Sequence, residues 1–226
     1  EGVWNLTTMS FSSSIFEYEG FLTELKMKYG EYIQDYWVSI MTKLWHYKRG
    51  FLLDKKKGEF ALMMGERENK IKLDELDIKI LGILLNNGRI KYIDLARKLK
   101  EHPKLIRDRV NRMIKEEVIL GVTPYYDMSK LEMIYFKVHF NLKNYSMKEF
   151  NSLLRYAQDH PNIVHVVEAV GGADYEIEVQ VKSNNELYDI IEDIKIKFAD
   201  IIYDYYFMEY TKEHTLDYLP REMMVK

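Results

Sequence analysis

The spacing of apolar residues changes once along this chain of 226 residues, from a helical period to a period of two. Between Asp74 and Lys115 apolar residues recur every three or four positions, which predicts amphipathic helices. From Ile134 onward they alternate with polar residues or form short runs, which predicts strands. Two separate stretches with different periods predict an α+β fold, in which a helical domain precedes a sheet domain.

Three helices are predicted in the first stretch. The first covers residues 74–85 and ends at Asn86-Asn87-Gly88, and the second covers residues 92–99. Pro103 suits the first turn of the third helix, where its missing N–H costs nothing. The third helix places its apolar residues on one side, and these are Ile106, Val110, Met113 and Ile114.

The charge of the chain is concentrated around these helices. The net charge is only -3, but ten basic residues face three acidic ones between Arg89 and Lys115. A basic segment in an acidic chain is the footprint of a module that binds a polyanion, whereas the alternative is a solvated helical face. The basic side of the third helix favours a tri-helical or winged helix-turn-helix domain that binds double-stranded DNA through the major groove.

Candidate DNA contacts follow from this arrangement. Residues on the outer side of the third helix are predicted to contact base edges or the adjacent backbone, and these are Lys104, Arg107, Asn111 and Lys115. Basic residues elsewhere in the segment are predicted to contact phosphate or to pack, and these are Arg89, Lys91, Lys98 and Arg109. Arg109 borders the apolar side, so packing is the stronger alternative for it.

The second stretch predicts the order βαββαβ, which is the ferredoxin-like arrangement. The expected elements are strand 134–142, helix 147–157, strands 163–170 and 174–181, helix 187–198 and strand 201–211. Strands 163–170 and 201–211 have apolar residues on both faces. Because a sheet that is apolar on both sides needs a second cover, we expect another copy of the sheet there, in a homodimer or an internal pseudo-dimer.

The N-terminal quarter resembles the end of the sheet domain. With a shift of 169 positions, residues 24–36 align with residues 193–205, and five of 13 pairs are identical. Residues 1–50 are therefore predicted to be a partial ferredoxin-like strand–helix–strand unit, although chance similarity of two amphipathic units is the alternative. The expected layout is this partial unit (1–50), a charged linker (51–71), the helix-turn-helix (72–122), the ferredoxin-like sensing and oligomerisation domain (123–220) and a tail (221–226), so that Glu1 begins within a domain.

Several of these segments together resemble one family. Leu73-Asp74-Glu75-Leu76-Asp77-Ile78-Lys79-Ile80-Leu81, with Asn87-Gly88-Arg89, Leu95-Ala96, Arg109-Val110 and Val118-Ile119, resembles the DNA-binding domain of the Lrp/AsnC transcription regulators. Gly171-Gly172-Ala173-Asp174-Tyr175 is similar to the Gly-x-x-Asp-Tyr loop of that family, near which small effectors, often amino acids, bind between subunits. By this resemblance Gly172 and Asp174 are candidate effector-binding residues, whereas the alternative is a hairpin turn.

The chain departs from the family pattern at the recognition helix. Lys100-Glu101-His102 stands where the family has Gly-Leu-Ser, and Glu117 stands where it has glycine. Glycine and asparagine are the usual residues in left-handed positions, and serine is a better N-cap than histidine. These changes imply either altered specificity or a degenerate DNA-binding domain.

Other functions are excluded or left without support. The chain has no cysteine, which excludes a disulfide scaffold, an iron–sulfur protein and a cysteine enzyme. No apolar run approaches the ~20 residues of a membrane span and no signal peptide is visible, so a cytoplasmic protein without a membrane partner is expected. The six histidines show no helical metal-binding spacing and no P-loop is present, so neither a cofactor nor an enzyme is predicted. His139 and His165 are expected on one sheet face.

Two alternatives to a DNA-binding regulator remain. Some proteins similar to this family decarboxylate siroheme and work as pairs of related modules, which would suit a tandem chain with a weakened helix-turn-helix. The other alternative is a ligand-binding or interaction protein with a vestigial DNA-binding domain. The basic side of the third helix argues against the enzyme, which would not need it.

Overall fold

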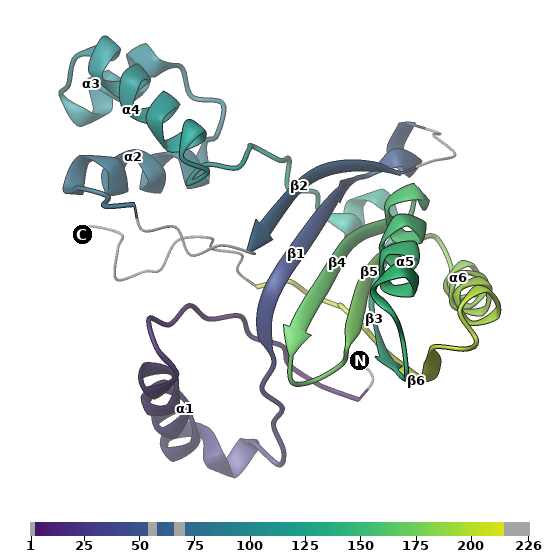
Figure 1. The fold of residues 1–226 in the computed structure, drawn as a ribbon. Coiled ribbons are helices and arrows are strands. Elements are labelled where there is room, and N and C mark those ends of the chain that lie inside the picture. The colour runs from purple at the N-terminus through teal and green to yellow at the C-terminus, as the bar shows by residue number, and fades with distance from the viewer. Residues whose placement is uncertain (1–2, 54–57, 66–70, 215–226) are drawn as a thin grey trace.

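The computed structural model describes residues 3–53, 58–65 and 71–214 and confirms the α+β class (Figure 1). A small three-helix domain lies apart from a six-stranded antiparallel sheet that has two helices on one face. Within the described ranges, no helix has the length and apolar character needed to cross a membrane.

The βαββαβ unit predicted from the period of two is present. Its strands follow the order β4-β5-β3-β6 in the sheet, and every neighbouring pair is antiparallel. Both helices begin at a serine whose hydroxyl accepts a backbone N–H of the first turn, which satisfies a donor that the helix itself cannot. The elements are β3 (Ile134–Leu142), α5 (Met147–Asp159), β4 (Ile163–Val170), β5 (Tyr175–Val181), α6 (Asn184–Lys197) and β6 (Ile202–Glu209).

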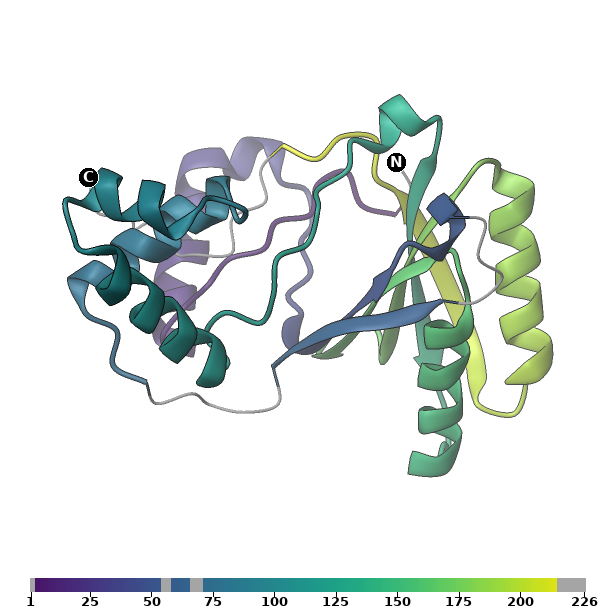
Figure 2. The ribbon, with the colours of Figure 1, turned by 90° about the horizontal axis from the view of Figure 1, so that it is seen from above.

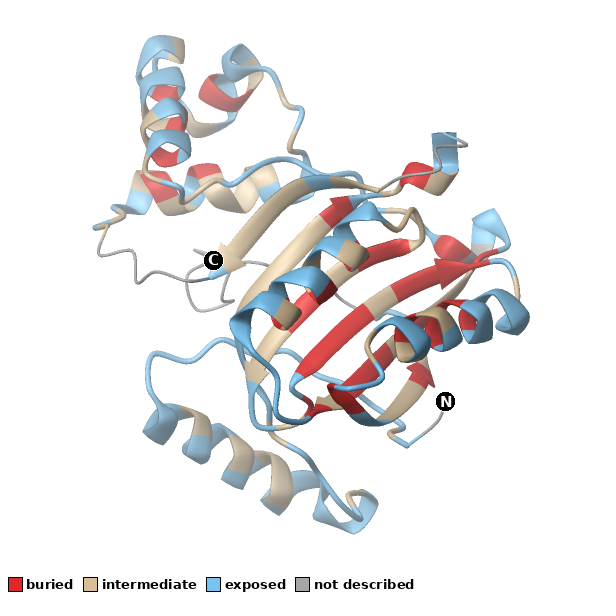
Figure 3. Cartoon of the chain, turned by 45° about the vertical axis from the view of Figure 1, so that its right-hand side comes forward, coloured by how far each residue is buried: buried red, intermediate tan, exposed pale blue. Residues whose placement is uncertain are grey.

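The main hydrophobic core lies between this sheet and its two helices (Figure 3). Alternate residues of β3 point into it, and Val138 and Phe140 are completely buried. Leu153 of α5 and Leu187 of α6 meet them from the helix side and are also completely buried. Removal of this apolar surface from water supplies most of the stabilisation of the domain.

Two further strands extend the sheet beyond β4. β1 (Ile40–Lys48) pairs with β4, and β2 (Glu59–Gly65) pairs with β1, both antiparallel. Trp45 and Tyr47 of β1 pack against the main core. The prediction of a linker over residues 51–71 is therefore wrong at β2. The charged residues on both sides of this short apolar run led to the whole segment being predicted as a linker. Pairing with β1 also covers an edge of β4 that would otherwise be open.

Residues 1–50 differ in detail from the predicted strand–helix–strand unit. Helix α1 (Ile15–Tyr29) is present, but residues 3–14 contain no strand. The following strand begins at Ile40, whereas the internal similarity placed it from about residue 33. A strand needs a neighbour to satisfy its backbone groups, and β1 finds that neighbour in β4. The division of the chain into domains stays a proposal.

The helix-free face of the sheet is polar at its centre, on the inner strands β3 and β5, so the expectation of a sheet that is apolar on both faces, which rested on strands 163–170 and 201–211, does not hold there. Five polar side chains from alternate positions on these two strands lie there, and all are largely buried. They are Lys137, His139, Glu176, Glu178 and Gln180. Successive side chains of a strand point to opposite faces of the sheet. The apolar residues of β3 and β5 face the core beneath α5 and α6, so the polar residues between them face the other side.

Segments of the same chain lie over this face. The N-terminal segment and the connector that follows the three-helix domain run on the side of the sheet opposite α5 and α6 (Figure 2). The ring of Trp37 stacks on Tyr206 at 5.9 Å, and Tyr206 stacks on His139 at 4.5 Å. A second copy of the sheet is therefore not required to bury the centre of this face, and the homodimer stays a prediction.

The three predicted helices of the small domain are confirmed as α2 (Glu75–Asn86), α3 (Tyr92–Leu99) and α4 (Pro103–Lys115). Ile114, expected on the apolar side of α4, is instead 49% exposed, because it lies about 100° around the helix from the completely buried Met113. No strand accompanies these helices within residues 71–127, so the domain is tri-helical rather than winged in that range. Its buried core consists of Ile80, Leu95, Ala96, Ile106, Val110 and Met113.

Candidate nucleic-acid interface

Helix α4 presents a polar, basic surface to solvent. Its four predicted contact residues are all exposed, on the side opposite the buried Ile106 and Val110, and they are Lys104, Arg107, Asn111 and Lys115. The guanidinium of Arg107 lies 3.5 Å from the carboxylate of Asp108, and both side chains are about half exposed. Such an exposed pair is weak, so it does not hold Arg107 away from another anion. Three cations and an amide thus share one accessible helix face.

A buried carboxylate fastens α4 to α2. The side chain of Asp77 has no exposed surface and accepts hydrogen bonds from Arg109, at 3.1 Å, and from Arg112. Arg109 also donates to Asp74, the N-cap of α2. This hydrogen bond from Arg109 is the main cause that lowers the pKa of Asp74 to about 2. The orientation of the recognition helix is therefore fixed by ion pairs as well as by the apolar core.

The same two aspartates cap the helix that they anchor. Asp74 accepts the backbone N–H of Asp77 at 3.0 Å, and Asp77 accepts the backbone N–H of Asp74 at 3.1 Å. This reciprocal capping box leaves Oδ2 of Asp74 and Oδ1 of Asp77 to Arg109, while Oδ2 of Asp77 accepts from both Arg112 and the backbone N–H of Asp74. The sequence signal was the pair of acidic residues spaced three apart at the helix start, but sequence reasoning assigned Asp77 no role. Of the two alternatives for Arg109, the contacts support packing.

The unusual residues before and after α4 occupy left-handed backbone positions. Lys100 and Glu117 both have φ of 57°, at the places where the family has glycine. His102 still caps α4, because its Nδ1 accepts the backbone N–H of Lys104 at 3.2 Å. The helix-turn-helix geometry is thus kept, and the non-glycine residues impose a backbone strain.

Lys100→Gly is expected to stabilise the three-helix domain by about 0.5–1 kcal/mol, because glycine adopts the left-handed conformation without a Cβ clash but loses more entropy on folding. The matched control is Lys98→Gly inside α3, which should destabilise the domain by about 1 kcal/mol. Urea unfolding followed by far-ultraviolet circular dichroism measures both. A loss of stability in Lys100→Gly would contradict the strain.

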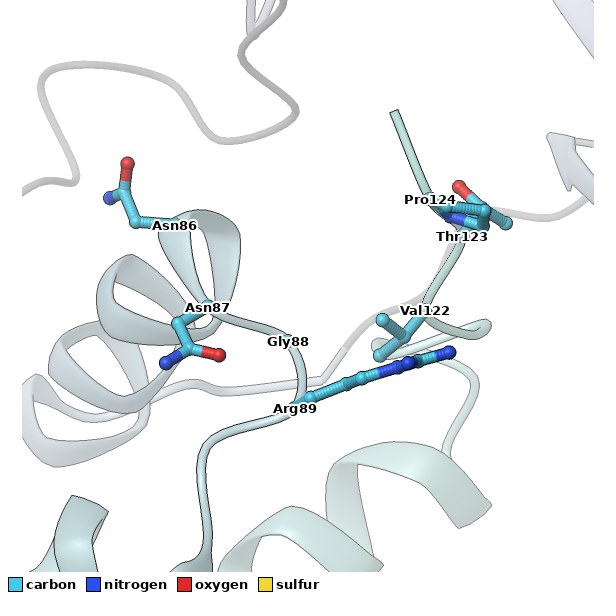
Figure 4. A pocket seen from close by; sticks show the side chains of 7 residues that line it. All are labelled: Asn86, Asn87, Gly88, Arg89, Val122, Thr123 and Pro124. Carbon is cyan, nitrogen blue, oxygen red and sulfur yellow. The ribbon is translucent and has the colours of Figure 1, made fainter. Parts of the chain in front are cut away.

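The turn between α2 and α3 packs against the connector that leaves the domain. Seven residues line an open cavity of about 350 Å³ between them (Figure 4), and they are Asn86, Asn87, Gly88, Arg89, Val122, Thr123 and Pro124. A Cβ on Gly88 would lie 2.6 Å from Cγ1 of Val122, so any other residue here would force the side chain of Val122 to move. The side chain of Arg89 extends beside Val122 and is exposed, as are Lys91 and Lys98. All three remain accessible to phosphate.

The candidate effector loop has the geometry of a hairpin turn. Gly171 and Gly172 have φ of 80° and 75°, which favours glycine at both positions. One carboxylate oxygen of Asp174 accepts the backbone N–H of Leu142 at 2.8 Å and ties the loop to the end of β3. These contacts give the loop a structural role, and effector binding by Gly172 and Asp174 stays a prediction.

A hydrogen-bonded chain of side chains crosses the helix-free face. Nε2 of His165 lies 2.7 Å from Nδ1 of His46, and Nδ1 of His165 lies 2.6 Å from a carboxylate oxygen of Glu178. The hydroxyl of Tyr135 donates to the same carboxylate. The pairing of β3, β4 and β5 places His139 on this face with His165, as expected. His46 and Glu178 were missed because three distant strands bring these groups together.

Burial and neighbouring charges together set the protonation of this hydrogen-bonded chain. Burial, with smaller contributions from His165 and Arg49, lowers the pKa of His46 to about 3. Burial raises the pKa of the Glu178 carboxyl, but His165 and Lys137 outweigh that effect and hold it at about 2. Within the described ranges, no group of three or more histidine or acidic side chains could hold a metal ion. Neutral His46 of β1 and anionic Glu178 of β5 both contact His165 of β4, and these contacts join β1 to the sheet.

Comparison with known proteins identifies the three-helix domain. Residues 73–114 match the AsnC-type helix-turn-helix domain. The HTH-type transcriptional regulator LrpC of Bacillus subtilis is 29% identical over 122 residues, which cover 54% of this chain and 83% of that protein. The Leucine-responsive regulatory protein of Haemophilus influenzae is 45% identical over 58 residues, which cover 26% of this chain and 34% of that protein.

Solved structures agree with the fold of both domains. The transcriptional regulator NMB0573 of Neisseria meningitidis, solved as a complex with L-Met, superposes with a TM-score of 0.60 at 16% identity. The match covers 68% of this chain and all of that one. At this identity the likeness establishes the common fold of helix-turn-helix and sheet domain.

Proposed function

We propose that this chain, which has an AsnC-type helix-turn-helix domain and resembles the Lrp/AsnC regulators, binds double-stranded DNA and regulates transcription in the cytoplasm. The observation that supports this most directly is the exposed basic face of α4, whose residues are not used by the domain core. Lys104, Arg107 and Asn111 are the proposed base contacts, and the exposed Lys115, Arg89, Lys91 and Lys98 are the proposed phosphate contacts. Arg109 acts by holding α4 in position.

Lrp/AsnC-type DNA binding by a homodimer would place two α4 helices on one duplex, about one helical turn apart. Such a pair would bind a two-fold symmetric operator, as dimeric helix-turn-helix proteins do. Sedimentation with a duplex that holds one or two half-sites tests this arrangement. Binding of one chain per two-half-site duplex would contradict it.

Arg107→Ala is expected to weaken binding to a selected duplex by about 1–3 kcal/mol, or about 5- to 150-fold, because it removes a bidentate base contact. The duplex comes from in vitro selection with the wild-type chain, and fluorescence anisotropy at fixed salt measures the affinity. Arg155→Ala on α5 is the matched control, since it removes the same charge from an exposed site in the sheet domain. Equal affinities of the two variants would remove Arg107 from the interface.

A small effector is the second part of the proposal. The L-Met complex of the structurally similar Neisseria regulator supports an amino acid as the class of ligand. The backbone N–H of Gly172 can donate to a carboxylate, and the remaining oxygen of Asp174 can accept from an ammonium group. Calorimetric titration with L-methionine and the other amino acids tests this. Absence of heat for every amino acid would remove the loop from that role.

A further inference from the structure

Helix α1 repeats α6 in structure as well as in sequence. Lys26 and Tyr36 align with Lys195 and Tyr205 under the shift of 169 positions. The ammonium of Lys26 lies 3.8 Å from the ring centre of Tyr36, and that of Lys195 lies 4.9 Å from the ring centre of Tyr205. A lysine of each helix therefore lies against the ring of the aligned tyrosine that follows it, and Lys26 also donates a hydrogen bond to the Tyr36 hydroxyl at 2.6 Å.

The two helices differ in what covers them. The apolar face of α6 is buried against the sheet through Leu187, Ile190, Ile191 and Ile194. The aligned residues of α1 are Tyr18, Phe21, Leu22 and Leu25, which are also all apolar or aromatic. None of them is buried, since α1 contains no buried residue. Helix α1 thus has a complete core-facing stripe without a sheet beneath it (Figure 1).

The residue types that make the polar contacts of α6 also occur at the aligned positions of α1. The hydroxyl of Tyr156 on α5 donates to Asp193 at 2.8 Å, and the ammonium of Lys197 lies 4.9 Å from the Tyr156 ring centre. Glu24 and Lys28 are the aligned residues of α1. Helix α1 therefore keeps an anion and a cation at the two positions by which α6 binds a tyrosine of the neighbouring helix. This complementarity specifies the helix that should lie beside α1.

We propose that the apolar face of α1 is a docking surface for a β-α-β half of a ferredoxin-like domain, with a tyrosine on its helix in the position of Tyr156. That half would correspond to β3, α5 and β4, which precede the region that aligns with residues 3–53. Docking would bury the stripe against the sheet of that half. This surface is separate from α4 and independent of DNA binding.

The test attaches such a half to the full chain. Residues 132–172 of this chain, which contain β3, α5 and β4, are fused to the N-terminus through a flexible linker that gives a high effective concentration. Hydrogen exchange of the α1 amides is the readout, because an uncovered helix of this length is marginal and exchanges fast. Protection of α1 is expected to rise at least about ten-fold in the fusion.

Two variants of the fusion make the result specific. Leu25→Glu places a charge in the stripe and is expected to abolish the added protection. Met27→Glu is the matched control, since Met27 is 83% exposed and its counterpart Ile196 on α6 is 74% exposed. Unchanged exchange of α1 in the fusion would overturn the proposal, and so would equal effects of the two variants.

Discussion

Replacement of Asp77 by alanine is expected to destabilise the three-helix domain by about 3 kcal/mol, because it leaves Arg109 and Arg112 without their buried partner. The capping box of α2 loses one of its two members in the same variant. Since α4 would then be held only by the apolar core and the ion pair of Arg109 with Asp74, affinity for DNA should fall together with stability. Urea unfolding followed by far-ultraviolet circular dichroism measures the loss.

Two features make this measurement selective. Asp94→Ala is the matched control, because Asp94 forms an exposed ion pair with Arg97 on α3, and such pairs contribute under about 1 kcal/mol. The three tryptophans, Trp4, Trp37 and Trp45, all lie outside the three-helix domain, so their fluorescence should be unchanged in Asp77→Ala. If both aspartate variants lose the same stability, Asp77 does not act as a buried anchor.

Acidification from about pH 7 to about pH 5 is expected to destabilise the sheet domain by about 3 kcal/mol. Burial lowers the pKa of His46 and His139 to about 3 and that of His160 to about 4, whereas an unfolded histidine titrates near 6.5. Below about pH 6.5 the unfolded chain therefore binds protons that the folded chain does not, and stability falls.

The size of this effect follows from the number of histidines. Each contributes at most about 1.4 kcal/mol per pH unit, and the partial exposure of His46 and His160 reduces the total. The fall should continue down to about pH 4, where His160 begins to bind a proton in the folded state as well. Tryptophan fluorescence during urea unfolding at several pH values measures it, because Trp45 packs against the sheet core.

His160→Gln separates the histidines from the carboxylates. Nδ1 of His160 accepts the backbone N–H of Asn162 at 3.2 Å, which requires that nitrogen to be unprotonated, and a glutamine oxygen can take its place. This variant should lose about a third of the pH dependence above about pH 5. Equal stability of the wild-type sheet domain at pH 7 and pH 5 would contradict the buried neutral histidines.

The local parts of the fold could be predicted from the sequence. The helical period over residues 74–115 gave α2, α3 and α4, and the alternation from Ile134 gave the βαββαβ order. The outer residues of α4 followed from the same geometry, because which residues share a helix face depends only on their spacing. The left-handed positions of Lys100 and Glu117 were indicated by the glycines that the family has there.

Contacts between distant segments could not be predicted in this way. Strand β2 was not predicted from the sequence, because a short strand is stabilised by pairing with its neighbour, here β1, more than by its own residues. Asp77 looked like any acidic residue of a first helical turn until α4 placed two arginines against it. His46 meets His165 and Glu178 only because three strands from separate parts of the chain pair in register.

The sequence by itself therefore determined the elements of each domain and the basic face of α4, since periodicity and charge spacing act within one helix or strand. Only the tertiary structure decided that a buried aspartate anchors α4, that β1 and β2 extend the sheet, and that its helix-free face holds buried polar groups. The physical reason is that burial and ion pairing depend on which segments meet in space. The uncovered stripe of α1 needed both kinds of information, because the sequence shows that it is apolar and the structure shows that none of its residues is buried.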